Sequence, residues 1–204
     1  MEVVLGIRHP LMPPKRYDYI NIGDNKKIGE EFLSYFTDLC KLKPNQKVLE
    51  IGSGFGRMAI PLTNYLNKNG SYDGLEIMDD GVNWCKSQFT KRYPNFNFNK
   101  LDVYNERYNP KGKVLATEVT FPFADNTFDI IYLTSVFTHM YPDAIKNYLS
   151  EISRILKPNG KSLITYYILN NESLKNINND KSTYSFNYEK KTYRIEDNED
   201  PLYQ

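Results

Sequence analysis

The sequence predicts an α/β fold in which a mostly parallel sheet lies between two layers of helices. Short runs of β-branched and aromatic residues alternate with longer segments in which apolar residues recur every three or four positions. Three alternate glycines, Gly52, Gly54 and Gly56, join the first of these runs to the helix that follows. Strands that alternate with helices favour parallel pairing and helices on both faces, so we expect a three-layer α/β/α arrangement.

The individual elements follow from the same patterns. The first helix should start near Lys26 and end before Pro44, because Ile28, Phe32, Phe36 and Leu39 recur at helical spacing. Strands are predicted over 48–51, 72–77, 96–101, 128–133 and 162–169. Further helices are predicted over 58–66, over 79–92 and after Pro142, the last with Ile145, Leu149, Ile152 and Leu156 on its buried face.

The chain reads as one domain preceded by an arm. Residues 1–25 contain Pro10, Pro13 and Pro14, and proline removes a backbone donor and blocks helix, so this stretch should be irregular. We expect the domain to cover 26–204, with its core at 42–169 and a polar tail at 170–204. A chain of 204 residues is long enough to bury a substantial core.

Composition and charge exclude several classes of function. The net charge is +1, so long-range attraction to nucleic acid should be weak and a nucleic-acid partner is not expected. No apolar run approaches the roughly 18 residues that a membrane helix needs. The N-terminus also lacks the features of a signal peptide. We therefore expect no membrane association and a cytoplasmic location.

Cysteine and histidine usage does not favour a metal site. Cys40 and Cys85 lie in predicted helices without C-x-x-C spacing, so we expect buried thiols rather than a disulfide. The two histidines, His9 and His139, are far apart in the sequence. No metal is predicted.

The glycine segment Glu50-Ile51-Gly52-Ser53-Gly54-Phe55-Gly56 has the pattern E-x-G-x-G-x-G. Glycine permits positive φ and a close approach of the backbone to a ligand, and amide groups at the start of the next helix can point at that ligand. A dinucleotide-binding oxidoreductase would need G-x-G-x-x-G, but Arg57 occupies the third glycine position. A tight turn with no ligand is the alternative for the glycines alone.

Two more predicted strands end in carboxylates. Glu76 closes the second strand and could accept both hydroxyls of a ribose, while Asp102 closes the third and could accept from an adenine amino group. Either residue could instead be a helix cap or a solvated loop acid. Three acids at three strand ends, counted with Glu50, nevertheless favour a nucleoside-binding edge of the sheet.

Together these motifs resemble the class I S-adenosylmethionine-dependent methyltransferases, and in particular the type 11 group. The glycine segment resembles their first motif, Phe121-Pro122-Phe123-Ala124-Asp125-Asn126-Thr127-Phe128-Asp129 resembles the passage into their fourth strand, and Leu156-Lys157-Pro158-Asn159-Gly160 resembles their turn into the fifth. The resemblance runs from about Leu42 to Leu169. It departs at Asn159, where the family often has glycine, but asparagine tolerates the left-handed conformation.

The resemblance implies a Rossmann-like fold, S-adenosylmethionine as cofactor and methyl transfer to an acceptor, which we expect to be a small molecule, with S-adenosylhomocysteine as product. Glu76 would bind the ribose and Asp102 the adenine. The other implied cofactor-binding residues are Glu50, Gly52, Ser53, Gly54, Gly56, Ile77, Met78, Val103, Thr134 and Ser135. The acceptor itself is not predicted.

His139 is the candidate catalytic residue. It lies just past the predicted fourth strand, at the edge where open α/β sheets bind ligands, and histidine suits a general base because it titrates near neutral pH. A histidine that caps the following helix is the alternative. Tyr17 and Tyr19 of the arm could close over the acceptor as a lid or simply pack on the surface.

Two regions depart from the family plan. The connection 103–120 is long, and such loops read substrates in many enzymes, although disorder or a surface decoration would explain its length equally well. The tail is too short for the usual last strands, so we expect the C-terminal part of the sheet to be incomplete by family standards, with 191–195 able to form one strand. We expect the exposed fifth strand to be covered by that segment, by a second copy in a homodimer, or by another polypeptide. A catalytically silent cofactor-binding module, or half of a larger assembly, is the alternative function.

Overall fold

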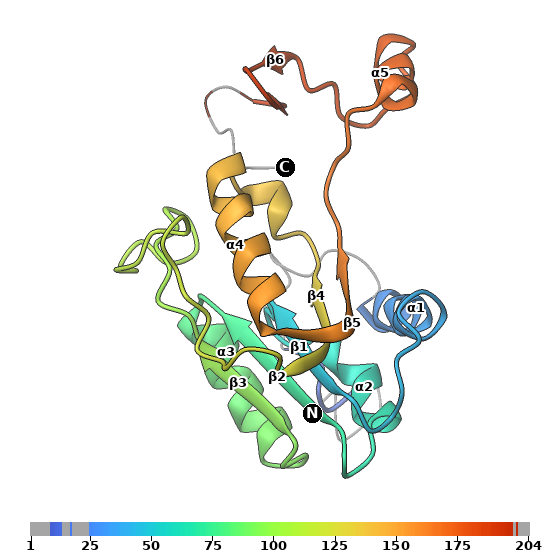
Figure 1. Cartoon of the computed structure of the whole chain (residues 1–204), viewed down its shortest axis with the longest axis vertical. Helices are drawn as coiled ribbons and strands as arrows, with labels where there is room; N and C mark the ends of the chain where they lie inside the picture. The colour runs from blue at the N-terminus through green and yellow to red at the C-terminus, as the bar shows by residue number, and fades with distance from the viewer. Residues whose placement is uncertain (1–8, 14–16, 18–24, 198, 200–204) are drawn as a thin grey trace.

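In a computed structural model of the chain, residues 9–13, 17, 25–197 and 199 are described (Figure 1). A five-stranded sheet has the order β3-β2-β1-β4-β5, and every neighbouring pair is parallel. The strands are β1 (Lys47–Ile51), β2 (Ser71–Glu76), β3 (Phe96–Lys100), β4 (Phe128–Leu133) and β5 (Leu156–Ile164). The parallel sheet confirms the predicted α/β class, and the central position of β1 brings its carboxyl end beside those of β2 and β4.

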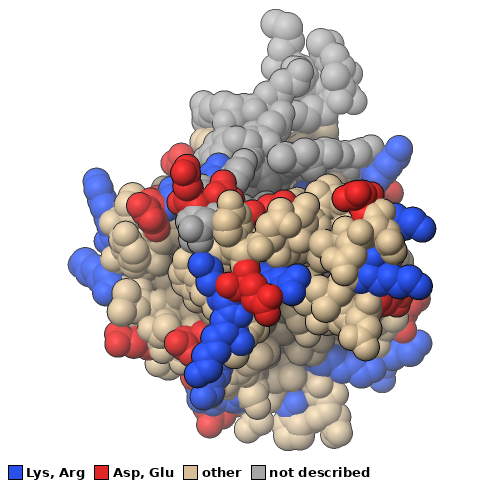
Figure 2. All heavy atoms as spheres, turned by 90° about the horizontal axis from the view of Figure 1, so that it is seen from above, with Lys and Arg blue, Asp and Glu red and all other residues tan. Residues whose placement is uncertain are grey.

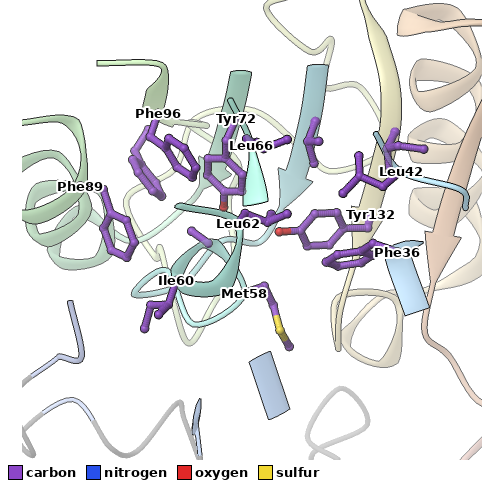
Figure 3. Close-up of a cluster of buried hydrophobic side chains, with 14 of the residues drawn as sticks. Phe36, Leu42, Met58, Ile60, Leu62, Leu66, Tyr72, Phe89, Phe96 and Tyr132 are labelled. Atoms are coloured by element: carbon purple, nitrogen blue, oxygen red, sulfur yellow. The ribbon is translucent and has the colours of Figure 1, made fainter. Parts of the chain in front are cut away.

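One face of the sheet is covered by three helices, α1 (Asn25–Asp38), α2 (Ala59–Tyr65) and α3 (Asp79–Cys85). Phe36 of α1 packs on Tyr132 of β4, and Tyr72 of β2 stacks on Phe96 of β3 (Figure 3). Aromatic side chains of three strands therefore form the core between the sheet and these helices. This face holds the larger share of the buried aromatic rings. The apolar residues of the first predicted helix recur at helical spacing because they pack into this core.

The opposite face is covered by α4 (Pro142–Ile155) and by the connection between β3 and β4 (Figure 1). Val103, Val119 and Phe121 of this connection are buried in the same core as Ile152 of α4. The long loop predicted over 103–120 is therefore neither disordered nor a decoration: it forms part of the second layer of the fold.

Arg154 fixes that connection to α4. Its guanidinium donates to the carbonyl oxygens of Phe121 and Phe123 at 3.0 and 2.8 Å, to Asp125 at 2.8 Å and to Glu151. The Glu151 carboxylate in turn accepts the Phe121 amide at 2.7 Å. Because a guanidinium can donate in several directions at once, one side chain orders the whole passage into β4.

Some predicted boundaries were wrong. Leu149 does not belong to the buried face of α4, since it is 45% exposed while Tyr148 beside it is buried. The buried stripe runs instead through Ala144, Tyr148, Ile152 and Ile155, one residue around the helix from the predicted face. Leu156 is the first residue of β5 rather than the last of the helix, because it pairs with Phe128.

The fifth strand also differs from its predicted range of 162–169. It runs from Leu156 to Ile164, and the Thr165 amide makes the final backbone bond, to the Leu133 carbonyl at 3.1 Å. Beyond Leu133 the chain of β4 turns away at Ser135, which has a positive φ of 56°, so later residues have no strand to pair with. Tyr166, Tyr167 and Ile168 are consequently exposed.

The third helix follows its prediction over 79–92 closely. After α3 the helix continues as a wider, π-type turn, Lys86–Thr90, which places Phe89 in the core. Pro61 lies near the start of α2, as expected. Asn159 adopts a φ of 67°, which confirms that it replaces glycine at a left-handed position.

The tail forms small elements of its own: α5 (Asn171–Asn178), which begins with a capping box between Asn170 and Ser173, and the antiparallel pair β6 (Tyr188–Glu189) and β7 (Arg194–Ile195). These elements lie beyond the carboxyl end of β5 and not along its edge (Figure 1). The segment predicted to form a strand at 191–195 thus pairs with β6, and within the described residues β5 pairs with β4 alone.

The distribution of surface charges and the state of the two cysteines agree with the sequence analysis. Lysine and arginine side chains are interspersed with aspartate and glutamate over the face in Figure 2. Cys40 and Cys85 are buried free thiols, as predicted. Of the helices in the described ranges, none is both long enough and apolar enough to cross a membrane.

Candidate cofactor site

The glycine loop between β1 and α2 uses all three of its predicted glycines. Gly52, Gly54 and Gly56 have φ values of 81°, 52° and 81°. A methyl group on Gly52 would come within 2.5 Å of the Val136 side chain, and one on Gly56 within 2.7 Å of the Phe89 ring. No described atom lies within 4 Å of the same position on Gly54. The loop is therefore packed tightly at both ends and open in its middle.

Most amides of the loop are already bonded within the protein. The amides of Gly52 and Ser53 donate to the Leu75 carbonyl at 2.8 and 3.0 Å, and the Gly56 amide donates to the Ser53 carbonyl at 2.9 Å. The amides predicted to meet a ligand are those at the start of the helix after Gly56, and the bonds of the loop do not test that prediction. The glycine loop itself is hydrogen-bonded to the end of β2. It therefore contributes open space beside Gly54 rather than free amides that could bind an anion.

Glu76, at the end of β2, holds the same loop through its side chain. Its carboxylate accepts the Gly54 amide at 2.6 Å and the amides of Ile77 and Met78 at 2.8 and 2.9 Å. The side chain is 4% exposed. Burial raises the pKa of Glu76, and the bonds from Met78, Gly54 and Ile77 act against that rise because they favour the ionised form.

Glu50 points into the interior and not along the edge of the sheet. Its carboxylate accepts the hydroxyl groups of Tyr72 and of Tyr132, the latter at 3.0 Å. Figure 3 shows both rings in the aromatic cluster under α1 and α2. Burial raises the pKa of Glu50 to about 8, against the lowering effect of the two tyrosine bonds and of Arg57.

The start of α3 is pressed against the loop. A methyl group on Gly81 would come within 2.6 Å of the Gly54 carbonyl oxygen, so only glycine lets the helix approach so closely. The Cys85 thiol, one turn further along, donates to the same carbonyl at 3.7 Å. The sequence patterns did not predict that Gly81 and Cys85 contact the loop. A glycine in the first turn of a predicted helix, directly after Asp79 and Asp80, was the available sign of a close backbone approach.

At the end of β3, Asp102 and Val103 face opposite ways. The Asp102 side chain is exposed, whereas Val103 is buried in the second core and its carbonyl accepts from Asn109 at 2.8 Å. Ser53 is likewise turned inward: its hydroxyl is buried, has no partner among the described residues and lies against Gly74. Of these three predicted residues, only Asp102 offers a side chain to a ligand at this edge.

A hollow of about 490 Å³ opens beside these strand ends, lined by Met78, Asp79, Asp80, Arg107 and Tyr108. Met78 immediately precedes α3, and Ile77 next to it packs partly into the second core. Arg107 and Tyr108 come from the connection after β3, so the hollow lies between two loops that leave adjacent parallel strands. Ligands of open α/β sheets bind at such positions.

The end of β4 completes the edge. Thr134 is half-buried, and the Ser135 amide donates to the Thr165 hydroxyl at 2.9 Å. His139 ends a short 3₁₀ turn, Phe137–His139, and its ring lies 6.3 Å from that of Tyr108 at 75°. The predicted catalytic histidine is therefore next to a residue that lines the hollow.

Tyr17 of the N-terminal arm contacts the glycine loop. The Tyr17 ring stacks on that of Phe55 with centroids 4.3 Å apart, and lies 6.4 Å from the Trp84 ring of α3. Tyr19 lies outside the described residues. Tyr17 thus packs against the glycine loop, and whether the arm also closes over an acceptor stays a prediction.

The structure brings together Gly52, Gly54, Gly56, Glu76, Met78, Asp102, Thr134, Ser135 and His139 along one edge of the sheet. This edge holds the glycine loop, the buried Glu76 and, next to Met78, the hollow. The family described as "Methyltransferase domain" matches residues 49–164, more than half of the chain. The chain belongs to this family, of the class I S-adenosylmethionine-dependent type, which confirms the resemblance.

Individual relatives agree with that assignment. Over 131 residues the chain is 30% identical to sterol 24-C-methyltransferase erg6 of Schizosaccharomyces pombe, covering 64% of this chain and 29% of the relative. Over 170 residues it is 28% identical to the ubiquinone/menaquinone biosynthesis C-methyltransferase UbiE of Rickettsia bellii, covering 83% and 61%. The chain therefore spans between about three tenths and three fifths of the length of these relatives.

A solved structure supports the fold. The chain resembles a SAM-dependent methyltransferase from Aquifex aeolicus with a TM-score of 0.50 and 20% identity, covering 72% of this chain and 69% of the other. At this identity the likeness concerns the fold alone.

Proposed function

We propose that this protein transfers a methyl group from S-adenosylmethionine to a small-molecule acceptor. The observation that carries the proposal is the glycine loop held by Glu76: the position of a Cβ on Gly54 is open, and Met78, whose amide donates to the same Glu76 carboxylate, lines a hollow of about 490 Å³. Ligand pockets are commonly about 300 to 1,000 Å³, so the hollow has a suitable size for such a cofactor. When bound, S-adenosylmethionine supplies an activated methyl group on a sulfonium centre.

The residues at the edge fit the two ends of this cofactor. Glu76 would accept the ribose hydroxyls and exposed Asp102 would accept from the adenine, while Met78 would pack on the purine beside Ile77. Gly54 leaves room for the backbone to lie close to the ligand, and Thr134 and Ser135 would flank its methionine portion. Glu50, Ser53 and Val103 are directed into the protein, so their part would be to hold the loop and strand end in place.

His139 would act as a general base when the acceptor is a hydroxyl. It lies past the end of β4 and beside Tyr108 of the hollow, at a position from which it could take a proton from an acceptor. The remaining work of the protein is alignment of the two reactants and exclusion of water. According to their names, the relatives methylate carbon, one on a sterol and one in quinone biosynthesis. The residues of this chain do not identify a class of acceptor.

Two measurements on the purified chain test the proposal. Calorimetry with S-adenosylhomocysteine should detect binding, and tritium from methyl-labelled S-adenosylmethionine should appear in a fraction of small-molecule acceptors. The Glu76→Ala variant, in the same assay, should transfer little label. Binding without transfer to any acceptor would instead favour the catalytically silent module, and absence of binding would contradict both.

A cytoplasmic location and a homodimer belong to the same proposal. Within the described residues the outer edge of β5 carries no strand, and soluble proteins usually cover such an edge. A second copy of the chain is the cover that we favour. Light scattering should then give the mass of a dimer, and a monomer in which the β5 amides exchange slowly would contradict it.

A further inference from the structure

We infer that Tyr108, presented by the hairpin 105–109, forms the outer wall of the cofactor pocket and contacts the adenosyl part of S-adenosylmethionine. This inference rests on the proposed function and adds a binding residue that lies outside the glycine loop and the two strand-end acids. Three observations carry it: the rigidity of the hairpin, the position of Tyr108 in the hollow, and the ring contacts that fix its orientation.

The hairpin is held by its own asparagines. The Asn105 side chain accepts the amides of Arg107 and Tyr108 at 3.0 and 2.8 Å, and the backbones of Asn105 and Asn109 bond to each other in both directions. The Asn109 side chain, 6% exposed, donates to the Val103 carbonyl at 2.8 Å. A buried amide that anchors a loop to the end of β3 makes the tip a fixed part of the edge.

Tyr108 lines the same hollow as Met78, which comes two residues after Glu76. If Glu76 holds the ribose, the base attached to that ribose lies near the hollow, between the start of α3 and the hairpin. An adenine ring is flat, and aromatic side chains stack well on bases. Tyr108 is the aromatic residue among those that line this hollow.

Neighbouring groups hold the Tyr108 ring in place. The Arg107 guanidinium carbon lies 5.6 Å from the ring centroid, within cation–π range, and the His139 ring meets it at 75°. The ring therefore links the hollow to the predicted base. Arg107 lines the hollow itself and, in this arrangement, also holds the Tyr108 ring.

Calorimetry with two probes tests the inference: S-adenosylhomocysteine, and 5′-methylthioadenosine, which lacks the amino-acid part. Tyr108→Ala should weaken both by a similar factor, about five- to a hundredfold from the loss of one stacking contact. Tyr108→Phe keeps the ring and should stay within about twofold of wild type. Tyr104→Ala is the matched control, since Tyr104 belongs to the same connection, is 45% exposed and does not line the hollow.

The outcomes separate the inference from the proposed function. Weakening confined to S-adenosylhomocysteine would move the contact to the methionine end and overturn the inference. Unchanged affinity of Tyr108→Ala, in a protein where Glu76→Ala binds less tightly, would overturn the inference and leave the proposed function standing. A wild-type protein that binds neither probe would overturn both. Circular dichroism spectra of the variants that match wild type establish that each one is folded.

Discussion

The Glu76 carboxylate accepts the backbone amide of Gly54 at 2.6 Å, and this bond joins the end of β2 to the open middle of the glycine loop. The same carboxylate accepts two amides from the start of the next segment. A carboxylate offers about four lone-pair sites, so one remains beyond these three bonds. Accepting both hydroxyls of a ribose would therefore require one of the three amides to be released or shared, which couples cofactor binding to the shape of the loop.

Glu76→Ala should weaken S-adenosylhomocysteine binding by about thirtyfold, roughly 2 kcal/mol, because it removes a shielded charged acceptor and loosens the Gly54 peptide. Calorimetry measures the change. Glu172→Ala, on the exposed face of α5, serves as control and should bind as wild type does. Equal affinity in a folded Glu76→Ala protein would rule out the ribose assignment.

Gly81→Ala should lower cofactor affinity although alanine favours helix. The added methyl group would meet the Gly54 carbonyl at 2.6 Å, and overpacking of this kind costs about 1–3 kcal/mol, more than the propensity gain of about 1 kcal/mol. Thermal unfolding and calorimetry should both report the loss. Asn83→Ala, at an exposed position of α3, is the control, and a Gly81→Ala protein as stable and tight-binding as wild type would contradict the close packing.

His139→Gln should reduce turnover by roughly 10²- to 10⁴-fold with an oxygen acceptor, the usual effect of losing a general base. Cofactor affinity should remain near the wild-type value, because the Asn105 side chain and Arg107 still hold Tyr108 when the His139 ring contact is lost. Steady-state kinetics over a range of pH, with calorimetry in parallel, measure both. Turnover close to wild type across the pH range would make His139 a structural residue.

Glu50 should make the folded protein less stable as pH rises. Burial raises its pKa to about 8, so between its unfolded pKa near 4.5 and pH 8 the folded state keeps a proton that the unfolded state has lost. The free energy of unfolding should fall through this window by up to about 1.4 kcal/mol per pH unit from this group. Urea unfolding at pH 6 and pH 8 compares wild type with Glu50→Gln, which should lose this part of the slope. The same change in the free energy of unfolding between pH 6 and pH 8 in both proteins would contradict a buried, neutral Glu50.

Arg154→Ala should destabilise the fold by about 1–3 kcal/mol, since it leaves the carbonyls of Phe121 and Phe123 without this donor and frees the passage into β4. Arg154→Lys keeps the charge but not the planar fork and should give an intermediate loss. Urea unfolding provides the measurement. Lys146→Ala, on the exposed face of the same helix, should change stability by less than about 0.5 kcal/mol.

Local patterns in the sequence were sufficient for the order of strands and helices from α1 to β5 and for the glycine loop, but not for α5 and β6 in the tail. Apolar periodicity reflects which face of an element is buried. Positive φ at three alternate positions is visible in the sequence as three glycines, because glycine tolerates this conformation best. The acid at the end of β2 and the left-handed Asn159 were predicted for the same reason. Each of these features depends on a residue and its immediate neighbours.

Other features depended on contacts between distant segments, which no local pattern records. The inward orientation of Glu50 follows from the pleat of β1 and from Tyr72 and Tyr132 on its two neighbouring strands. The end of β5 at Ile164 was set by the turn of β4 at Ser135, and the approach of Gly81 to Gly54 by the packing of α3. The meeting of Tyr108 with His139 likewise joins two connections that only the parallel sheet brings to one edge. Sequence therefore determined which residues could form a cofactor edge, and tertiary packing decided which of them face it.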